Sequence, residues 1–220
     1  MEIYEIPEAY VKVMANENDT ITVLNHGNVV FDYKGKYEFK ILDDRTFAII
    51  KREHNEFNFS ILNLFYVNDE NKLSSAKYIM NYSDKLFDKD LLNKKMMIVT
   101  SKHGEYIVNF NLNIVSSSFF YDKITYDKEE DLFYVEEYAM TDHGIVTLFG
   151  TLNSTGVLLD NSLYCPYLKI NFIVDPSNVF NSCMSIKKEI HKILENIDKK
   201  KKKDEILNYE CEAYLTRKKR

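Results

Sequence analysis

The chain has 220 residues, of which 45% are hydrophobic and 29% are charged, and this composition excludes a chain that is disordered throughout. No run of 18 apolar residues is present, so no membrane-spanning helix is predicted, and the first residues lack the basic-then-apolar pattern of a secretory signal. The charge is uneven. Residues 176–220 carry 12 Lys and Arg against 7 Asp and Glu, a net charge of +5, whereas residues 1–175 carry 17 against 27, a net charge of −10.

Cysteine and glycine usage narrows the class of protein further. Cys165, Cys183 and Cys211 are widely spaced, which predicts neither a disulfide framework nor a zinc site, and each is expected to be a small buried residue. Unpaired cysteines and the missing signal favour a cytoplasmic protein. Six glycines are few for a nucleotide-binding fold, and no phosphate-binding loop is present, so no cofactor is expected.

Four histidines occupy one recurring context along the chain, each between a polar residue and a Gly or Asn. They are His26, His54, His103 and His143. Gly and Asn tolerate the positive φ of tight turns, and short runs of Val, Ile, Phe and Tyr flank each site. The pattern predicts four β-hairpins. Four converging histidines could also bind a metal, but no other metal-binding motif accompanies them, so no metal site is predicted.

A second feature recurs between the hairpins, a tyrosine followed closely by Lys and Ile or Leu. These segments are Tyr37–Ile41, Tyr82–Leu86, Tyr121–Ile124 and Tyr167–Ile170, and their tyrosines are 45, 39 and 46 residues apart. The chain is therefore expected to consist of about four repeats of 40–45 residues. One hairpin cannot bury its own apolar face, whereas stacked hairpins share a core.

This unit resembles the bacterial WG (KWG) repeat, with His at the position of the motif Trp in a chain that has no Trp. The best local matches are His103–Ile124 and His143–Ile170, and the resemblance spans roughly residues 20–170. WG-repeat proteins share no catalytic activity. The resemblance therefore implies a β-rich interaction scaffold.

The pattern changes after Ile170. Asp175 and Pro176 predict a capped helix start, and Ile186, Ile190 and Ile197 then follow on one helical face together with Ile193 and Leu194. A second stretch, 204–220, carries Leu207, Cys211, Tyr214 and Leu215 at helical spacing. The predicted fold is mainly β, with a β-repeat domain over 1–174 and a basic helical extension over 175–220.

The leading hypothesis for the function is a protein-binding module without catalytic activity. Its predicted contact residues are the tyrosines and acidic residues of one segment: Tyr121, Tyr126, Glu129, Glu130, Asp131, Tyr134 and Tyr138. Tyrosine is enriched at binding hot spots, and an acidic body attracts a basic partner, for example a nucleic-acid-handling enzyme that the protein would inhibit.

The alternative is a nucleic-acid-associated protein that uses the basic tail. The residues concerned are Lys199, Lys200, Lys201, Lys202, Lys203, Arg217, Lys218, Lys219 and Arg220. Lysine runs neutralise phosphates, but only Tyr209 and Tyr214 are near for base stacking, so sequence-specific recognition is not predicted. Attachment to a membrane surface is disfavoured, because no Trp or Phe follows Phe180. An enzyme is disfavoured too, since Ser116–Ser118 lacks the context of a catalytic serine.

Overall fold

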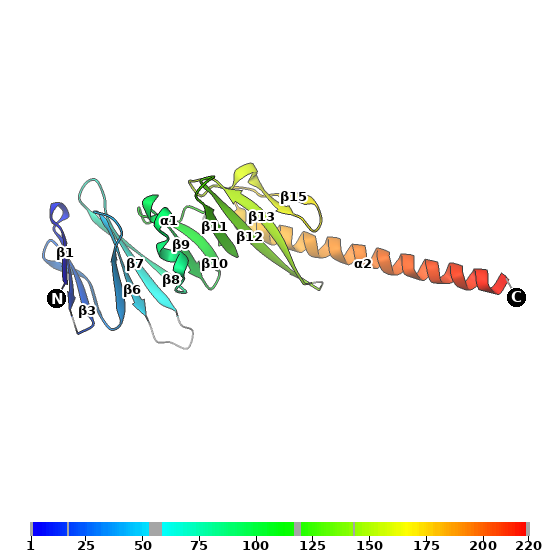
Figure 1. Ribbon diagram of the computed structural model, residues 1–220, viewed down its shortest axis with the longest axis horizontal. Helices are drawn as coiled ribbons and strands as arrows, with labels where there is room; N and C mark the ends of the chain where they lie inside the picture. The colour runs from blue at the N-terminus through cyan, green and yellow to red at the C-terminus, as the bar shows by residue number, and fades with distance from the viewer. Residues whose placement is uncertain (1, 17, 53–58, 117–119, 143, 219–220) are drawn as a thin grey trace. The chain divides into compact units, whose positions relative to one another are not determined.

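The computed structural model describes residues 2–16, 18–52, 59–116, 120–142 and 144–218, with side chains up to residue 201. It confirms the mainly β fold and the C-terminal helix (Figure 1). The chain forms two compact units. Unit 1 holds residues 1–135 and 151–158, and unit 2 holds residues 136–150 and 159–220. The predicted domain boundary at residue 175 stays a prediction.

Unit 1 contains three antiparallel sheets. The first sheet has the order β1 (Glu2–Ile6), β2 (Val11–Asn16), β3 (Thr20–Asn25) and β4 (Asn28–Lys34). The second has the order β5 (Tyr37–Ile41), β6 (Thr46–Arg52), β7 (Ser60–Val67) and β8 (Leu73–Met80), and the third pairs β9 (Met96–Ser101) with β10 (Gly104–Asn109). Short helices connect them: η1 (Pro7–Ala9), η2 (Asp84–Phe87) and α1 (Lys89–Asn93).

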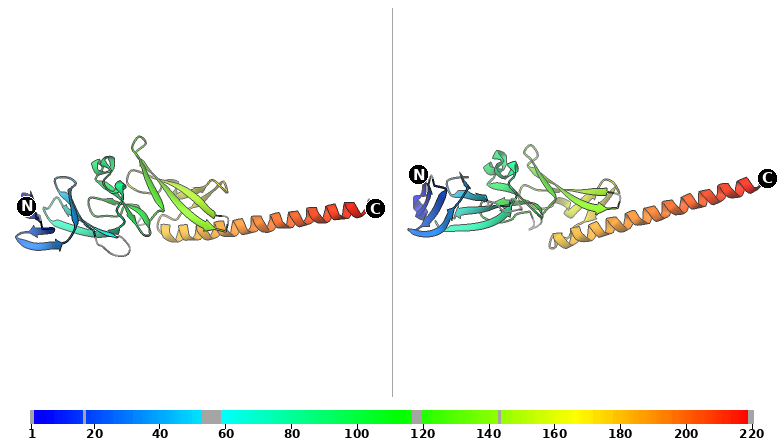
Figure 2. Two further views of the ribbon diagram at one scale, coloured as in Figure 1. Left: turned by 60° about the horizontal axis from the view of Figure 1, so that its bottom comes forward. Right: turned by 90° about the horizontal axis from the view of Figure 1, so that it is seen from below.

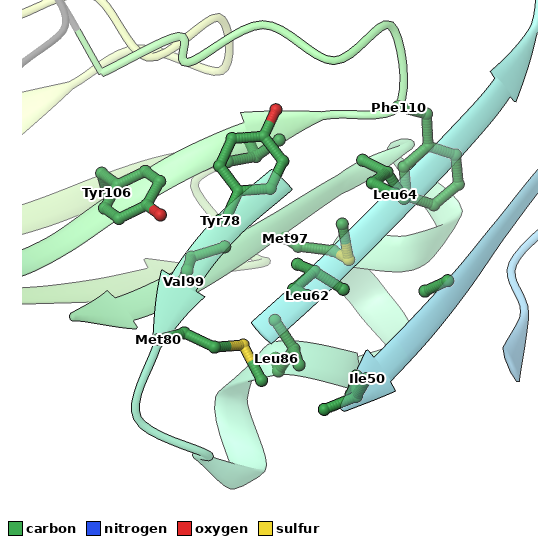
Figure 3. Close-up of a cluster of buried hydrophobic side chains, with 12 residues drawn as sticks. Ile50, Leu62, Leu64, Tyr78, Met80, Leu86, Met97, Val99, Tyr106 and Phe110 are labelled. Atoms are coloured by element: carbon green, nitrogen blue, oxygen red, sulfur yellow. The ribbon is translucent and has the colours of Figure 1, made fainter. Parts of the chain in front are cut away.

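The second sheet is buried on both faces, which makes it the middle layer of unit 1 (Figure 1). Phe47 and Phe65 stack at 4.8 Å on the face that packs against the first sheet. Ile50, Leu62 and Leu64 lie on the opposite face, in one cluster with side chains of the third sheet (Figure 3). Burial on both faces explains why β6 and β7 are continuous apolar runs instead of alternating ones.

A fourth sheet has the order β11 (Lys123–Asp127), β12 (Leu132–Thr141), β13 (Gly144–Leu152), β14 (Ser162–Cys165) and β15 (Ile170–Ile173). Strands β12 and β13 pass from one unit into the other, and η3 (Leu159–Asn161) precedes β14. Within unit 2, helix α2 (Val179–Lys218) follows the sheet.

The four predicted hairpins are present as β3–β4, β6–β7, β9–β10 and β12–β13. In the first, His26 and Gly27 both have positive φ, as a two-residue hairpin turn requires. In the third, Lys102 and His103 form the turn and Gly104 begins the next strand. His54 and His143 lie outside the described residues.

The four tyrosine segments between the hairpins do not share one conformation. Tyr37–Ile41 is strand β5, whereas Tyr82–Leu86 runs into the 3-10 helix η2. Tyr121–Ile124 leads into β11, and Tyr167–Ile170 runs from the turn after β14 into the first residue of β15. The hairpins therefore recur while the segments that connect them differ.

An ion pair between the partly exposed Lys85 and the buried Glu105 joins the third sheet to β11. Both carboxylate oxygens of Glu105, in β10, lie within 3.0 Å of Lys85 Nζ. The same carboxylate accepts hydrogen bonds from the Ile124 backbone N–H at 2.7 Å and from the Thr100 hydroxyl at 3.2 Å. Three donor groups thus make four hydrogen bonds to a carboxylate that is almost fully buried, which offsets the cost of removing its charge from water.

The backbone beside this pair is equally constrained. Glu105 and Tyr121 exchange two backbone hydrogen bonds, at 2.6 and 2.9 Å. Gly104 has φ +125°, and a Cβ atom there would lie 2.4 Å from the Tyr121 carbonyl oxygen. Only glycine permits this close approach, so the glycine after His103 fixes the path of the chain as well as the turn.

Helix α2 packs on one face of the unit 2 sheet through its first four turns. Its buried residues are Val179, Cys183, Ile186, Ile190 and Leu194. Lys187 forms an ion pair with Glu137 of β12, which is only 1% exposed, at 2.5 Å. Beyond this point Ile197 is 39% exposed, and the helix continues unbroken (Figure 2).

One detail of the predicted extension was wrong. The helix starts at Val179 rather than at Pro176, because Asp175 accepts hydrogen bonds from the Ser177 N–H and hydroxyl and closes a turn instead of capping the helix. The stretch from residue 204 continues α2 as far as Lys218.

We expect Glu105→Gln to lower the free energy of unfolding by about 2–3 kcal/mol, because it leaves Lys85 without its buried counter-charge. Urea denaturation measures the change. Glu70→Gln is the matched control: it breaks the exposed pair with Lys72 and should cost at most about 1 kcal/mol. Equal losses in the two variants would contradict the role of the buried pair.

We expect Ile190→Ala to destabilise the protein by about 3 kcal/mol, because this isoleucine is fully buried on the packed face of α2. Ile197→Ala makes the same change on the same helix, three residues beyond the last buried position, and should cost under about 1 kcal/mol. The same denaturation experiment distinguishes them, and an equal cost would show that α2 packs differently.

Candidate protein-binding surface

The predicted contact residues of unit 1 do not form one surface. Tyr121 is 0% exposed, so its prediction as a contact residue was wrong. Its place next to Gly104 and Glu105 puts the ring in the core. The tyrosine was misassigned because burial here comes from pairing with a strand that lies 16 residues earlier.

Tyr126 and Asp131 belong to a small polar cluster on the β11–β12 hairpin. Lys94 Nζ lies 2.5 Å from Asp131 Oδ1, and the Tyr126 hydroxyl donates to the same oxygen at 3.0 Å. The hydrogen bond from Lys94, aided by that from Tyr126, holds the pKa of Asp131 below its usual value. Asp131 also has φ +57°, so it shapes the turn. These residues stabilise the hairpin and are already engaged with one another.

Glu129 and Glu130 lie on the exposed side of the same turn. Their backbone N–H groups donate to Asp127 Oδ1, at 2.9 and 3.1 Å. The Tyr134 hydroxyl donates a hydrogen bond to Glu130 Oε2, which raises the pKa of Tyr134. The turn therefore presents acidic side chains on an ordered backbone, as a partner with basic groups would require.

A larger apolar surface lies in unit 2, on the sheet face opposite α2. We call this the open face, and its residues are Tyr138, Met140, Ile145, Phe149, Tyr164 and Ile173. The alternation along each strand defines it. Val146 and Leu148 are buried, whereas Ile145 and Phe149 of the same strand are exposed. The two faces of β13 are thus both apolar, although only one is covered.

Five of the six side chains of the open face are exposed, and Tyr138 is partly buried. Met140 is 75% and Ile173 79% exposed, and Phe149 is paired directly with Tyr164 across β13 and β14. The Tyr138 hydroxyl donates to Glu136 Oε2 at 2.8 Å, which places a carboxylate beside the apolar residues. A group of exposed apolar side chains with polar groups beside it is typical of a protein-binding site.

Only Tyr138 of the open face was among the residues predicted from the sequence. The missed signal is the run from Ile145 to Phe149, in which both faces carry large apolar side chains and only Thr147 is polar. An antiparallel strand with one solvated face alternates apolar and polar residues, so a departure from alternation indicates a second covered surface. That interpretation requires knowing that the sheet has a single helical cover.

The predicted basic tail lies on α2 beyond its packed turns. Lys199, Lys200 and Lys201 are exposed, and Lys199 lies 3.7 Å from Glu195 one turn earlier. Lys202, Lys203, Arg217 and Lys218 are part of the helix, and Lys219 and Arg220 lie outside the described residues.

The two described cysteines, Cys165 and Cys183, are buried as predicted. Burial and the nearby charge of Glu137 raise the pKa of the Cys183 thiol to about 12, so the thiolate is scarce at neutral pH. Among residues with described side chains, no three His, Cys, Asp or Glu are grouped as metal ligands. No helix within the described part of the chain is both long and apolar enough to cross a membrane.

No family model and no curated protein matches the chain. Its function is therefore inferred from the geometry of the surfaces described above.

We expect Lys94→Met to raise the pKa of Asp131 towards its ordinary value, because it removes the largest cause of the depression. Because the pKa of Asp131 is lower in the folded state, the cluster stabilises the fold at pH values above the ordinary pKa of Asp. This stabilisation is lost as the pH falls through the lowered pKa. Carbon-detected NMR titration of the carboxylate measures the shift. Lys128→Met, which removes the partner of Asp90 at 3.6 Å, is the control and should leave Asp131 unchanged.

Proposed function

We propose that the chain is a protein-binding module without catalytic activity, and that the open face of unit 2 is its contact surface. The observation that carries the proposal is the exposure of Met140, Ile145, Phe149 and Ile173 on a sheet whose other face is already covered by α2. Recurring hairpins, as the resemblance to WG repeats implies, provide the scaffold.

The chemistry of the partner follows from the two properties of the surface. Phe149 and Tyr164 offer rigid aromatic anchors that fit an apolar pocket or ridge. The acidic charge of residues 1–175 and the carboxylate of Glu136 favour basic groups around that ridge. An enzyme with a basic nucleic-acid channel combines these features, and a module seated there would inhibit it.

A second candidate function, association with nucleic acid, is favoured by one observation. Lys199, Lys200 and Lys201 are exposed on a part of α2 that lies beyond the packed residues. Such a helix end attracts phosphates without reading sequence, and its affinity falls steeply with salt.

The two functions are distinguished by capture from lysate at about 0.15 M salt, with and without nuclease, using three forms of the full chain. One is the wild type. The open-face variant carries Phe149→Ser with Tyr164→Ser, and the tail variant carries Lys199→Gln, Lys200→Gln and Lys201→Gln. All replaced side chains are exposed, so unfolding midpoints should change little.

We expect the wild type to capture one protein in stoichiometric amount despite nuclease, and the tail variant to capture the same protein. The open-face variant should bind it at least about 30-fold more weakly, which corresponds to a loss of about 2 kcal/mol at a hot spot. Mass spectrometry identifies it. Loss of every captured protein on nuclease treatment, or with the tail variant alone, supports nucleic-acid association instead. Capture of nothing by the wild type contradicts both.

A further inference from the structure

Unit 1 contains a cavity of about 410 Å³ beside β8 and the β9–β10 turn. Its apolar lining comes from Phe59, Ile79, Tyr106 and Phe120, and its polar lining includes Lys77, Lys102 and His103. The volume lies within the range of sites that bind small molecules.

The cavity has a wall of ordered aromatic rings. Tyr106 and Phe120 meet edge to face with ring centroids 4.9 Å apart, and the ring of His103 lies 6.2 Å from Phe120. Tyr106 also contacts Tyr78, whose hydroxyl is fixed by a 2.8 Å hydrogen bond to the Leu112 carbonyl (Figure 3). A flat or branched apolar group fits against this wall.

Tyr106 supplies an observation of a different kind. The residue is only 4% exposed and lines the cavity, yet no described residue accepts a hydrogen bond from its hydroxyl. Burial raises its pKa, so the hydroxyl remains a donor at neutral pH. Because Tyr106 lines the cavity, a bound ligand that carries an acceptor could receive the hydrogen bond from this hydroxyl.

The charge of the lining is positive and uncompensated. Lys77 and Lys102 are exposed and form no ion pair with a described residue, and none of the described lining residues is acidic. A smaller cavity of unit 1, near Lys85, differs in this respect: its Lys128 is paired with Asp90, and Lys85 itself is bound to Glu105. In a chain of net charge −5, two free lysines at the mouth of an apolar cavity favour an anion.

We propose that this cavity binds a small amphipathic anion. Its aromatic or branched body packs on Tyr106, Phe120 and Ile79, and its anionic group meets Lys77 and Lys102. The Tyr106 hydroxyl donates a hydrogen bond to an acceptor of the ligand. The site belongs to unit 1 and is independent of the open face in unit 2.

The test compares two probes that share one apolar body, naphthalene-1-acetate and its neutral amide, naphthalene-1-acetamide. Protein-observed NMR titration of the full chain follows the amides of residues 77–79 and 101–106. We expect the carboxylate to bind saturably, one per chain, at least about tenfold more tightly than the amide. No saturable carboxylate binding up to about 10 mM, or equal affinity of the two probes, overturns the proposal.

Variants assign the effect to residues. Lys77→Gln with Lys102→Gln should remove the preference for the carboxylate, whereas Lys34→Gln with Lys36→Gln, an equal change of charge on the first sheet and the loop that follows it, should retain it. Tyr106→Phe should weaken both probes several-fold without changing their ratio. The proposed site is contradicted if the preference for the carboxylate persists in the Lys77→Gln, Lys102→Gln variant. It is also contradicted if the preference disappears equally in the control variant. If Tyr106→Phe leaves the affinity for both probes unchanged, the proposed hydrogen bond from the Tyr106 hydroxyl to the ligand is contradicted.

Discussion

The buried carboxylate of Glu105 is the constraint on which the middle of the chain depends. It is bound at once by a side chain from η2, a side chain from β9 and a backbone amide from β11, at 20, 5 and 19 residues from it along the chain. A carboxylate buried with fewer partners would favour unfolding, so all three segments must be in place together. The third sheet and the entry to the fourth therefore form as one structure, with Gly104 allowing the backbones to approach.

The same arrangement recurs in unit 2, where Glu137 is buried and Lys187 of α2 provides its counter-charge. The apolar residues of α2 could pack on many sheet surfaces. The buried carboxylate of Glu137, however, favours the packing register that places Lys187 next to it. This interaction determines which face of the sheet is covered. It thereby determines which face remains open, and the open face carries the proposed binding surface.

The sequence predicts the hairpins and the helix because their signals are local. A positive φ requires Gly or its few substitutes, as at His26 and Gly27, and helical spacing is visible within one segment, as from Ile186 to Leu194. The core position of Tyr121 and the buried state of Glu105 depend on pairing between distant segments, which no local pattern reports. The cavity at Tyr106 is beyond prediction for the same reason, since its lining comes from four separate segments.

The basic tail and the open face differ in how specifically they would bind a partner. Like charges one turn apart destabilise a helix, so the run from Lys199 to Lys203 weakens the part of α2 that packing does not support. Any polyanion relieves that repulsion and attracts the tail through charge alone. Binding of nucleic acid by the tail would therefore follow from its composition whatever the protein does. Exposed Phe149 and Ile173 have no such general attraction to explain them, because water disfavours both, and a partner that covers them must match their shape.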